Sequence, residues 1–188
     1  MKSIDKEILL CDKCGNLKKL SCPTVQIGNT NILVIGESPA KNGWIVSNRA
    51  FYDVNGNLQS SGKVLSKLLN LCTLNLNDIY FTECCKCLLP DRKNLRKYAK
   101  NCKEFLFRQI EKLNIDIILP MGQFPTETIL DQKINKLSDY VGKQFEINIH
   151  NKKYTVIPIY HTSPINPLSY KGNEDIFKNL SKMIKSNK

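Results

Sequence analysis

The chain has 188 residues, 41% of them hydrophobic and 24% charged, with a formal net charge of +11. This length suits a single globular domain over residues 1–188, and neither a secretion signal nor a run of ~20 apolar residues is present, which excludes a membrane protein and indicates a cytoplasmic one. The excess of Lys and Arg favours a polyanionic partner such as nucleic acid, although a basic surface that only aids solubility has the same composition.

Strands and helices are predicted to alternate along the first half of the chain. Residues 31–35 form a short apolar run before Gly36, which is typical of a buried parallel strand. A helix with Ser60 or Ser61 as its cap follows, since apolar residues recur there at helical spacing. Residues 78–82 predict a second strand. A longer helix begins after the capping Asn94, with one apolar face and one basic face.

The second half continues this pattern. Residues 116–119 predict a third strand, and Pro125 suits the first turn of a short helix. Alternating apolar residues at 145–149, a turn at Asn151 and Lys152, and a strand at 154–160 predict a hairpin. Residues 174–185 form an amphipathic helix. The expected fold class is α/β, a single three-layer α/β/α domain with a largely parallel central sheet.

Polar residues follow three of the predicted strands. Gly36 and Glu37 come after the first strand, Glu83 after the second and His161 after the last. Each alone is more often a solvated turn carboxylate or a structural histidine. Ligands bind beyond the carboxyl ends of parallel strands, so these residues together predict one binding site.

Eight cysteines in a cytoplasmic protein indicate buried thiols and metal ligands rather than disulfides. Cys11-x2-Cys14 forms one pair, and Cys87 and Cys102 flank a segment rich in Lys and Arg. Four thiolates suit an iron-sulfur cluster or zinc, and Cys84 offers zinc an alternative set with Cys11, Cys14 and Cys87. Cys22 and Cys72 are assigned to packing. The basic residues of this segment are Arg92, Lys93, Arg96, Lys97, Lys100 and, directly after Cys102, Lys103.

The order of motifs resembles that of the iron-sulfur uracil-DNA glycosylases from Cys11 to the C-terminal helix. The matching features, in chain order, are Cys11-x2-Cys14, GESPA at 36–40, Ala50-Phe51-Tyr52, Ser61-Gly62-x-x-Leu65, TECCKC at 82–87, Cys102, ILPMG at 118–122 and His161. The resemblance implies a 4Fe-4S cluster held by Cys11, Cys14, Cys87 and Cys102, with zinc as the alternative. Such a cluster would brace the basic segment against DNA.

The same resemblance implies a DNA repair enzyme that hydrolyses the N-glycosidic bond of uracil or another deaminated base in single- or double-stranded DNA. Glu37 would lie near the attacking water or sugar, and His161 would hydrogen-bond the 2-keto oxygen of the leaving base. Phe51 would stack on the flipped base, although without the resemblance it reads as a core aromatic. Gly36 and Ser38 belong to the turn that would hold a phosphate, and Ser163 to a loop that would wedge into the duplex. A monomer is expected.

Two departures from the family pattern bear on activity. Where the family has an Asn that reads uracil, this chain has Glu83, and an ionised carboxylate there would repel the 4-keto oxygen. A protonated Glu83 would fit uracil, but would also fit cytosine-like edges. Residues 41–44 replace acidic residues of the family. The alternatives are therefore a DNA-binding member with little or no excision activity, which would bind damage or single strands, and a zinc-containing nucleic-acid module.

Overall fold

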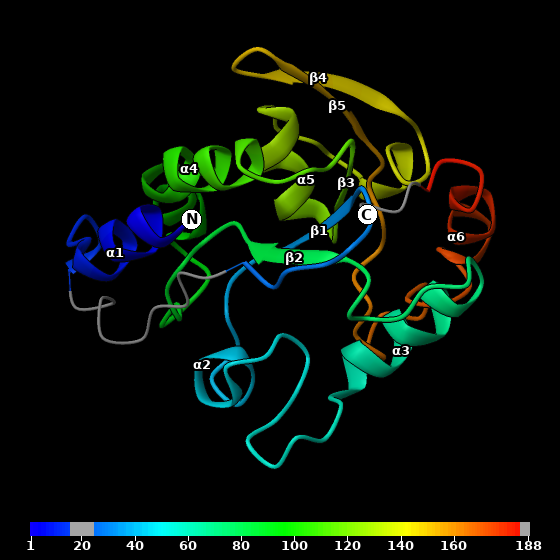
Figure 1. Ribbon diagram of the computed structural model, residues 1–188, viewed down its shortest axis with the longest axis horizontal. Coiled ribbons are helices and arrows are strands. Elements are labelled where there is room, and N and C mark those ends of the chain that lie inside the picture. Colours follow the sequence, from blue (N-terminus) through cyan, green and yellow to red (C-terminus); the bar gives the residue numbers. More distant parts are fainter. Residues whose placement is uncertain (16–24, 185–188) are drawn as a thin grey trace.

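The computed structural model describes residues 1–15 and 25–184 and is built around one five-stranded sheet (Figure 1). The strand order is β2 (Tyr80–Glu83), β1 (Ile32–Gly36), β3 (Ile117–Pro120), β5 (Lys152–Val156) and β4 (Phe145–Ile149). Only β4 runs antiparallel to its neighbour. The predicted largely parallel sheet is confirmed.

One face of the sheet is covered by α4 (Leu95–Glu111) and α5 (Gln123–Leu130). Leu33, Ile35 and Ile118 point toward these helices and are buried with their apolar residues. Removing such side chains from water is the main favourable term in folding. The face of α4 turned away from the sheet carries the exposed Arg and Lys residues.

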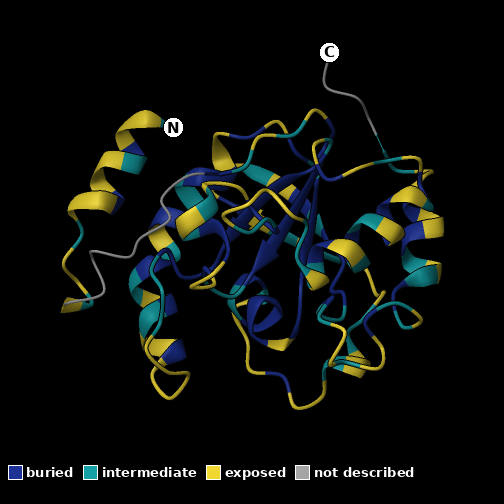
Figure 2. Ribbon diagram, turned by 90° about the horizontal axis from the view of Figure 1, so that it is seen from below, coloured by how far each residue is buried: buried dark blue, intermediate teal, exposed yellow. Residues whose placement is uncertain are grey.

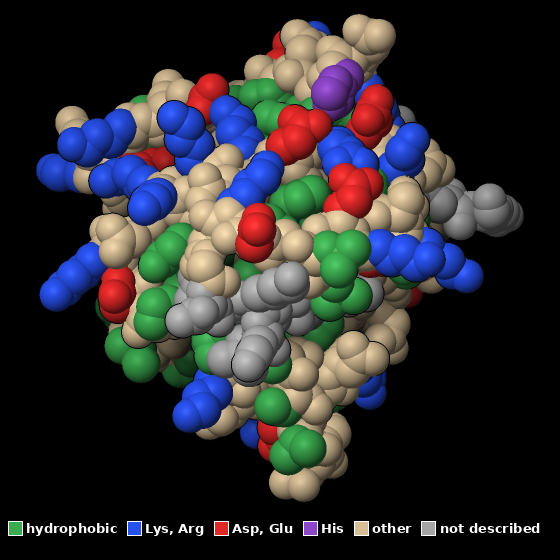
Figure 3. Space-filling model, turned by 90° about the vertical axis from the view of Figure 1, so that its left-hand side faces the viewer, with side chains coloured by type: hydrophobic (Ala, Val, Ile, Leu, Met, Phe, Trp, Pro, Cys, Tyr) green, Lys and Arg blue, Asp and Glu red, His purple; other side chains and the backbone are tan. Residues whose placement is uncertain are grey.

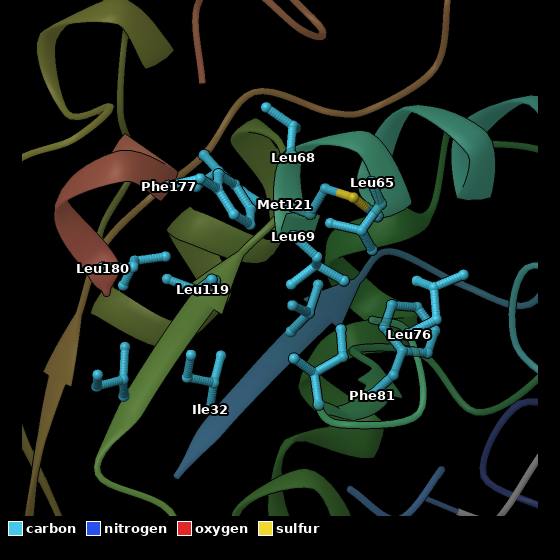
Figure 4. Packing of buried hydrophobic residues seen from close by; sticks show 14 of the residues in the cluster. Ile32, Leu65, Leu68, Leu69, Leu76, Phe81, Leu119, Met121, Phe177 and Leu180 are labelled. Atoms are coloured by element: carbon cyan, nitrogen blue, oxygen red, sulfur yellow. The ribbon is translucent and has the colours of Figure 1, made fainter. Parts of the chain in front are cut away.

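The opposite face is covered by α3 (Ser60–Asn70) and α6 (Glu174–Leu180). Figure 4 shows Leu68 of α3 and Phe177 of α6 beside Leu119 of β3 and Ile32 of β1. Strands β1, β2 and β3 are therefore buried on both sides, whereas β4 and β5 at the edge of the sheet carry exposed residues. The other exposed residues lie on loops and on the outer faces of the helices (Figure 2). The predicted three-layer α/β/α arrangement is confirmed.

Helix α1 (Lys2–Leu10) was not predicted from the sequence. It packs on the outside of α4, where Ile4 and Ile8 lie one helical turn apart and form a small buried cluster with Phe105. Arg108 adds two hydrogen bonds to Glu7, at 2.6 and 2.8 Å. The short helix α2 (Trp44–Ser47) and the 3₁₀ turn η2 (Leu137–Asp139) were also not predicted.

Several predicted ends are wrong by a few residues. Gln59, not a serine, precedes α3, and its main-chain N–H donates to the carbonyl of Phe51. The hairpin turn is formed by His150 and Asn151, one residue earlier than expected. Strand β5 ends at Val156, although the N–H groups of Ile157 and Ile159 still donate to the carbonyls of Ile118 and Pro120.

The predicted C-terminal helix is also too long, since α6 ends at Leu180. Cys72 lies in the hydrophobic core, as predicted, whereas Cys22 lies outside the described residues. Cys84 and Cys85 are buried in the core as well. Within residues 1–15 and 25–184, no helix combines the length and apolar character that crossing a membrane requires.

Candidate active site

A pocket of about 920 Å³ lies at the carboxyl edge of the sheet. In the parallel ladder Gly36 of β1 is paired with Glu83 of β2, so these two strand ends are neighbours. The chain continuing from β3 bridges to the segment after β5 through Met121 and Ile159, just before His161. The strand ends therefore meet at one site, as the predicted order indicates. Glu37, Phe51, Glu83 and His161 all line it.

Glu37 lies directly after β1 and is partly buried. Its Oε2 accepts a hydrogen bond from Nη2 of Arg92 at 2.5 Å, across 55 positions of the sequence. Burial raises the pKa of Glu37 above its usual value, and the charge and hydrogen bond of Arg92 oppose that rise. Arg92 therefore holds the carboxyl group of Glu37 at the wall of the pocket and favours its ionised form.

Glu83 ends β2 and is 9% exposed. Its Oε2 has no hydrogen-bond partner among the described residues, and the carboxyl group lies against the Cα of Gly36. Burial raises the pKa of Glu83 to about 8, Lys86 opposes this rise and the charge of Glu37 adds to it. Below that pH the side chain is a neutral acid, which can donate one hydrogen bond and accept another.

A buried lysine holds the strand end that carries Glu83. Lys86 is 1% exposed, and its Nζ donates to the carbonyl oxygen of Glu83 at 2.6 Å and to Oγ1 of Thr82 at 2.8 Å. The Thr82 hydroxyl donates in turn to Oε1 of the buried Gln109 of α4, at 3.4 Å. These polar groups fix the end of β2 against α4, because leaving any of them unpaired would cost stability.

Phe51 lies on the wall of the pocket and also belongs to the hydrophobic core. Its ring centroid lies 4.5 Å from that of Phe81, and its φ of 69° is in the left-handed region that non-glycine residues rarely adopt. Gly62 of α3 packs against the Cβ of Phe51, where a side chain would overlap it. Such a backbone is kept only where the surroundings enforce it, as happens at functional sites.

His161 follows the last parallel strand and lies partly buried in the wall of the pocket. Its Nδ1 accepts a hydrogen bond from the main-chain N–H of Ser163 at 3.0 Å, so the proton of the neutral ring is assigned to Nε2. Burial lowers the pKa of His161, and the nearby charge of Arg92 lowers it further. The site thus contains a neutral imidazole with one N–H donor available.

The remaining predicted site residues differ in whether they line the pocket. Gly36 and Ser38 line the pocket. Within the described part of the chain, Ser163 is not among the residues that line it, but its main-chain N–H donates to His161. Sequence reasoning treated Arg92 only as part of the basic segment, and it did not include Trp44, which also lines the pocket. No local pattern distinguishes Arg92 from its basic neighbours.

The basic segment forms one wall of the same pocket through Arg92, Lys93, Arg96 and Lys97. Lys and Arg side chains are also spread over the face of the molecule that carries α1, with carboxylates among them (Figure 3). A polyanion approaching the pocket would meet positive charge at its wall.

A second, much smaller pocket lies beside α1 and α4. Its lining includes Cys11, Cys14, Cys87 and Cys102, with the apolar Ile8 and Phe105. Burial raises the pKa of Cys87 to about 12, and the other three thiols add to the rise. Among the described residues, no three His, Cys, Asp or Glu side chains are arranged closely enough to hold a metal ion as they stand.

The structure also distinguishes the two possible sets of cysteine ligands, which differ in whether Cys84 or Cys102 is the fourth member. Cys84 is fully buried in the core between the sheet and α4 and does not line the cysteine pocket, whereas Cys102 does. Asn101 donates from Nδ2 to Sγ of Cys14 at 3.3 Å. The set with Cys102 is therefore the one that shares a pocket.

Comparison with known proteins gives a consistent result over most of the chain. A sequence model described as the Uracil DNA glycosylase superfamily matches residues 22–185. The Type-4 uracil-DNA glycosylase of Archaeoglobus fulgidus is 27% identical, over 97% of this chain and 94% of that protein. The protein of the same name from Saccharolobus solfataricus is 28% identical, over 97% and 86%. That from Thermotoga maritima is 25% identical, over 87% and 81%.

Proposed function

The chain belongs to the uracil DNA glycosylase superfamily, and we propose that it is a DNA repair enzyme that hydrolyses the N-glycosidic bond of uracil or another deaminated base in DNA. The observation that carries this proposal is the presence of Glu37, Phe51, Glu83 and His161 in one pocket. A base must leave the duplex stack to reach such a pocket, which then has to stack on it, read its edge and stabilise it as it departs.

His161 stabilises the leaving base. When the bond between C1′ of the sugar and N1 of uracil breaks, its electron pair remains on the base, and negative charge develops on the keto oxygens. The Nε2–H of the neutral imidazole donates to the 2-keto oxygen, since Nδ1 is already occupied by the N–H of Ser163. A preorganised donor of this kind contributes roughly 3 kcal/mol to the lowering of the barrier.

Glu37 acts on the other side of the bond that breaks. Its carboxylate orients the water that adds to C1′, and its charge favours the cationic character that the sugar acquires. The water oxygen ends on C1′ and the departing base is protonated. Because this role requires the ionised form, loss of charge at Glu37 should slow excision.

Phe51 and Glu83 bind the base before the reaction. The ring of Phe51 supplies a stacking surface, which is worth about 1–3 kcal/mol per base. Neutral Glu83 donates its acid proton to the 4-keto oxygen of uracil and accepts from the N3–H with its other oxygen. The same group fits the matching N–H and keto edge of other deaminated bases, so Glu83 extends the substrate class beyond uracil.

The basic wall binds the DNA backbone. Lys93, Arg96 and Lys97 supply positive charge at the pocket, and the turn at Gly36 and Ser38 supplies main-chain N–H donors near the nucleotide. The loop that carries Ser163 also bears Ile165, whose 93% exposure suits a residue that contacts the gap left by the flipped base. DNA is therefore the partner that this wall suits, and we propose that one copy of the chain binds it.

The four cysteines of the second pocket suit a 4Fe-4S cluster. They are soft thiol ligands that share one pocket, and the amide of Asn101 donates to the sulfur of Cys14, as outer-shell groups do around such clusters. When bound, the cluster supplies a covalent link between the segment after α1 and α4 rather than redox chemistry. Cys87 and Cys102 would then hold both ends of the basic segment.

Release of free base from oligonucleotides tests the proposal. Single- and double-stranded substrates carrying uracil, hypoxanthine or xanthine are incubated with enzyme in excess, and Glu37→Gln and His161→Asn serve as inactive controls. Release of uracil by the wild type, reduced about 10²–10³-fold in His161→Asn, supports the mechanism. Binding to the DNA without release of any of the three bases would support a DNA-binding protein instead.

A further inference from the structure

Arg92 differs from the other basic residues of its segment in the partner that it contacts. It lies in the loop between β2 and α4, its side chain is 75% exposed, and its hydrogen bond to Glu37 is 2.5 Å long. Arg96 instead binds Glu127 of α5 at 2.8 Å, and Lys103 binds Asp131 at 2.7 Å. Glu127 also lines the pocket, but among the described residues Arg92 is the member of the segment that is paired with Glu37.

The position of Arg92 places its charge near two reacting groups. It contacts Glu37 directly, and it is close enough to His161 to lower the pKa of that imidazole. For Glu37, burial favours the neutral acid, and Arg92 favours the carboxylate. For His161, burial and Arg92 both favour the neutral ring. Arg92 therefore favours, in both residues, the charge state that excision requires: the Glu37 carboxylate and the neutral His161 ring.

The other charged groups around Glu37 do not replace this effect. Glu83 at the end of β2 is a neutral acid below a pKa of about 8 and becomes a second negative charge above it. Lys93 and Lys97 line the pocket, and Arg96 is paired with Glu127. Within the described part of the chain, Arg92 provides the salt bridge to Glu37.

We propose that Arg92 is a positioning residue of the excision reaction, which holds Glu37 in place through their salt bridge and brings its positive charge into the pocket that His161 also lines. This inference rests on the proposed function and adds to it a residue that acts through Glu37 and His161 rather than on the base. A guanidinium suits the role because it remains charged throughout the working pH range. The contact also joins the basic wall to the turn after β1.

The pH profile of single-turnover uracil excision distinguishes this role from DNA binding. In Arg92→Met the pKa values of Glu37 and His161 should both rise, so the acidic limb should move to higher pH and the rate at pH 6 should fall about 2–5-fold, as for the loss of an exposed ion pair. Arg92→Lys retains the charge and should keep the limb near its original position. Lys93→Met is the matched control, because it should weaken DNA binding without moving the limb.

A second measurement does not depend on activity. The carboxyl carbon of Glu37 is titrated by ¹³C NMR in the full-length protein and in Arg92→Met, with Glu37→Gln used for assignment. A higher pKa of Glu37 in Arg92→Met supports the proposal, and equal values in the two proteins overturn it. If the wild type released no base, the proposed function would fail, while this titration would still show whether Arg92 lowers the pKa of Glu37.

Discussion

The carboxyl group of Glu83 occupies the space that a side chain at Gly36 would need. The two residues are paired in the parallel ladder between β1 and β2, and a Cβ built on Gly36 overlaps Oε2 of Glu83. Gly36 therefore lets a long acidic side chain lie across the end of the neighbouring strand. The relationship links the Gly-Glu turn to the position that reads the base.

Gly36→Ala should impair excision more than stability. The overlapping atom is the end of a side chain, so Glu83 can rotate away, and the free energy of unfolding should fall by less than ~1 kcal/mol. The displaced carboxyl group can no longer read uracil, and kcat/KM should fall at least about tenfold. When Gly36→Ala is added to the Glu83→Asn variant, whose side chain at position 83 is shorter, kcat/KM should fall by a smaller factor. Equal losses in both backgrounds would contradict this explanation.

The ionisation of Glu83 should set an upper pH limit for excision. The pKa of Glu83 is raised to about 8, so the side chain is neutral below that pH and becomes a carboxylate as the pH rises through it. The carboxylate repels the 4-keto oxygen of uracil, and the rate should fall above about pH 8. Glu83→Asn should remove this basic limb and raise uracil excision. A basic limb that survives in Glu83→Asn would assign it to another group.

The same shift predicts a pH-dependent stability difference. A carboxyl group whose pKa is higher in the folded protein contributes stability below its unfolded pKa, and that stability is lost as the pH rises toward the folded value. For Glu83 the window runs from the ordinary value of 4.5 to about 8. Glu83→Gln should therefore become more stable relative to the wild type between pH 5 and pH 8, as measured by the denaturant midpoint. A constant difference would show that Glu83 ionises normally.

The sequence predicts the layers of this fold well because the strands are short apolar runs and the long helices have one apolar face. Helix α1 escaped prediction because Ile4 and Ile8 become informative only when Phe105 of α4 packs against them. The pairing of Arg92 with Glu37 was not predictable either, since the two lie 55 residues apart and exposed arginines look alike in sequence. Phe51 was assigned to the site only through the resemblance to a family, because without that resemblance it is an ordinary core aromatic.

Phe51→Leu should separate the stacking role from the packing role. Leucine fills much of the same volume against Phe81 but offers the base no aromatic face, so the loss of stability should stay below that of an alanine substitution, which is about 3–5 kcal/mol for a buried Phe. Loss of stacking should raise the KM for uracil-containing DNA and slow excision about 5–100-fold. Full activity in a folded Phe51→Leu would leave Phe51 a core residue only.

Substitution of Cys102 tests the cysteine pocket against a matched cysteine elsewhere. Cys102→Ser removes one of the four thiols that share the pocket, so anaerobically purified protein should lose iron and visible absorbance. Because Cys102 lies in α4 at the end of the basic segment, DNA binding should weaken as well. Cys84→Ala changes a thiol of the core and should keep both the iron and the colour. If Cys102→Ser stayed coloured and bound DNA normally, Cys102 would not be a ligand, and zinc in place of iron in the wild type would establish the alternative metal.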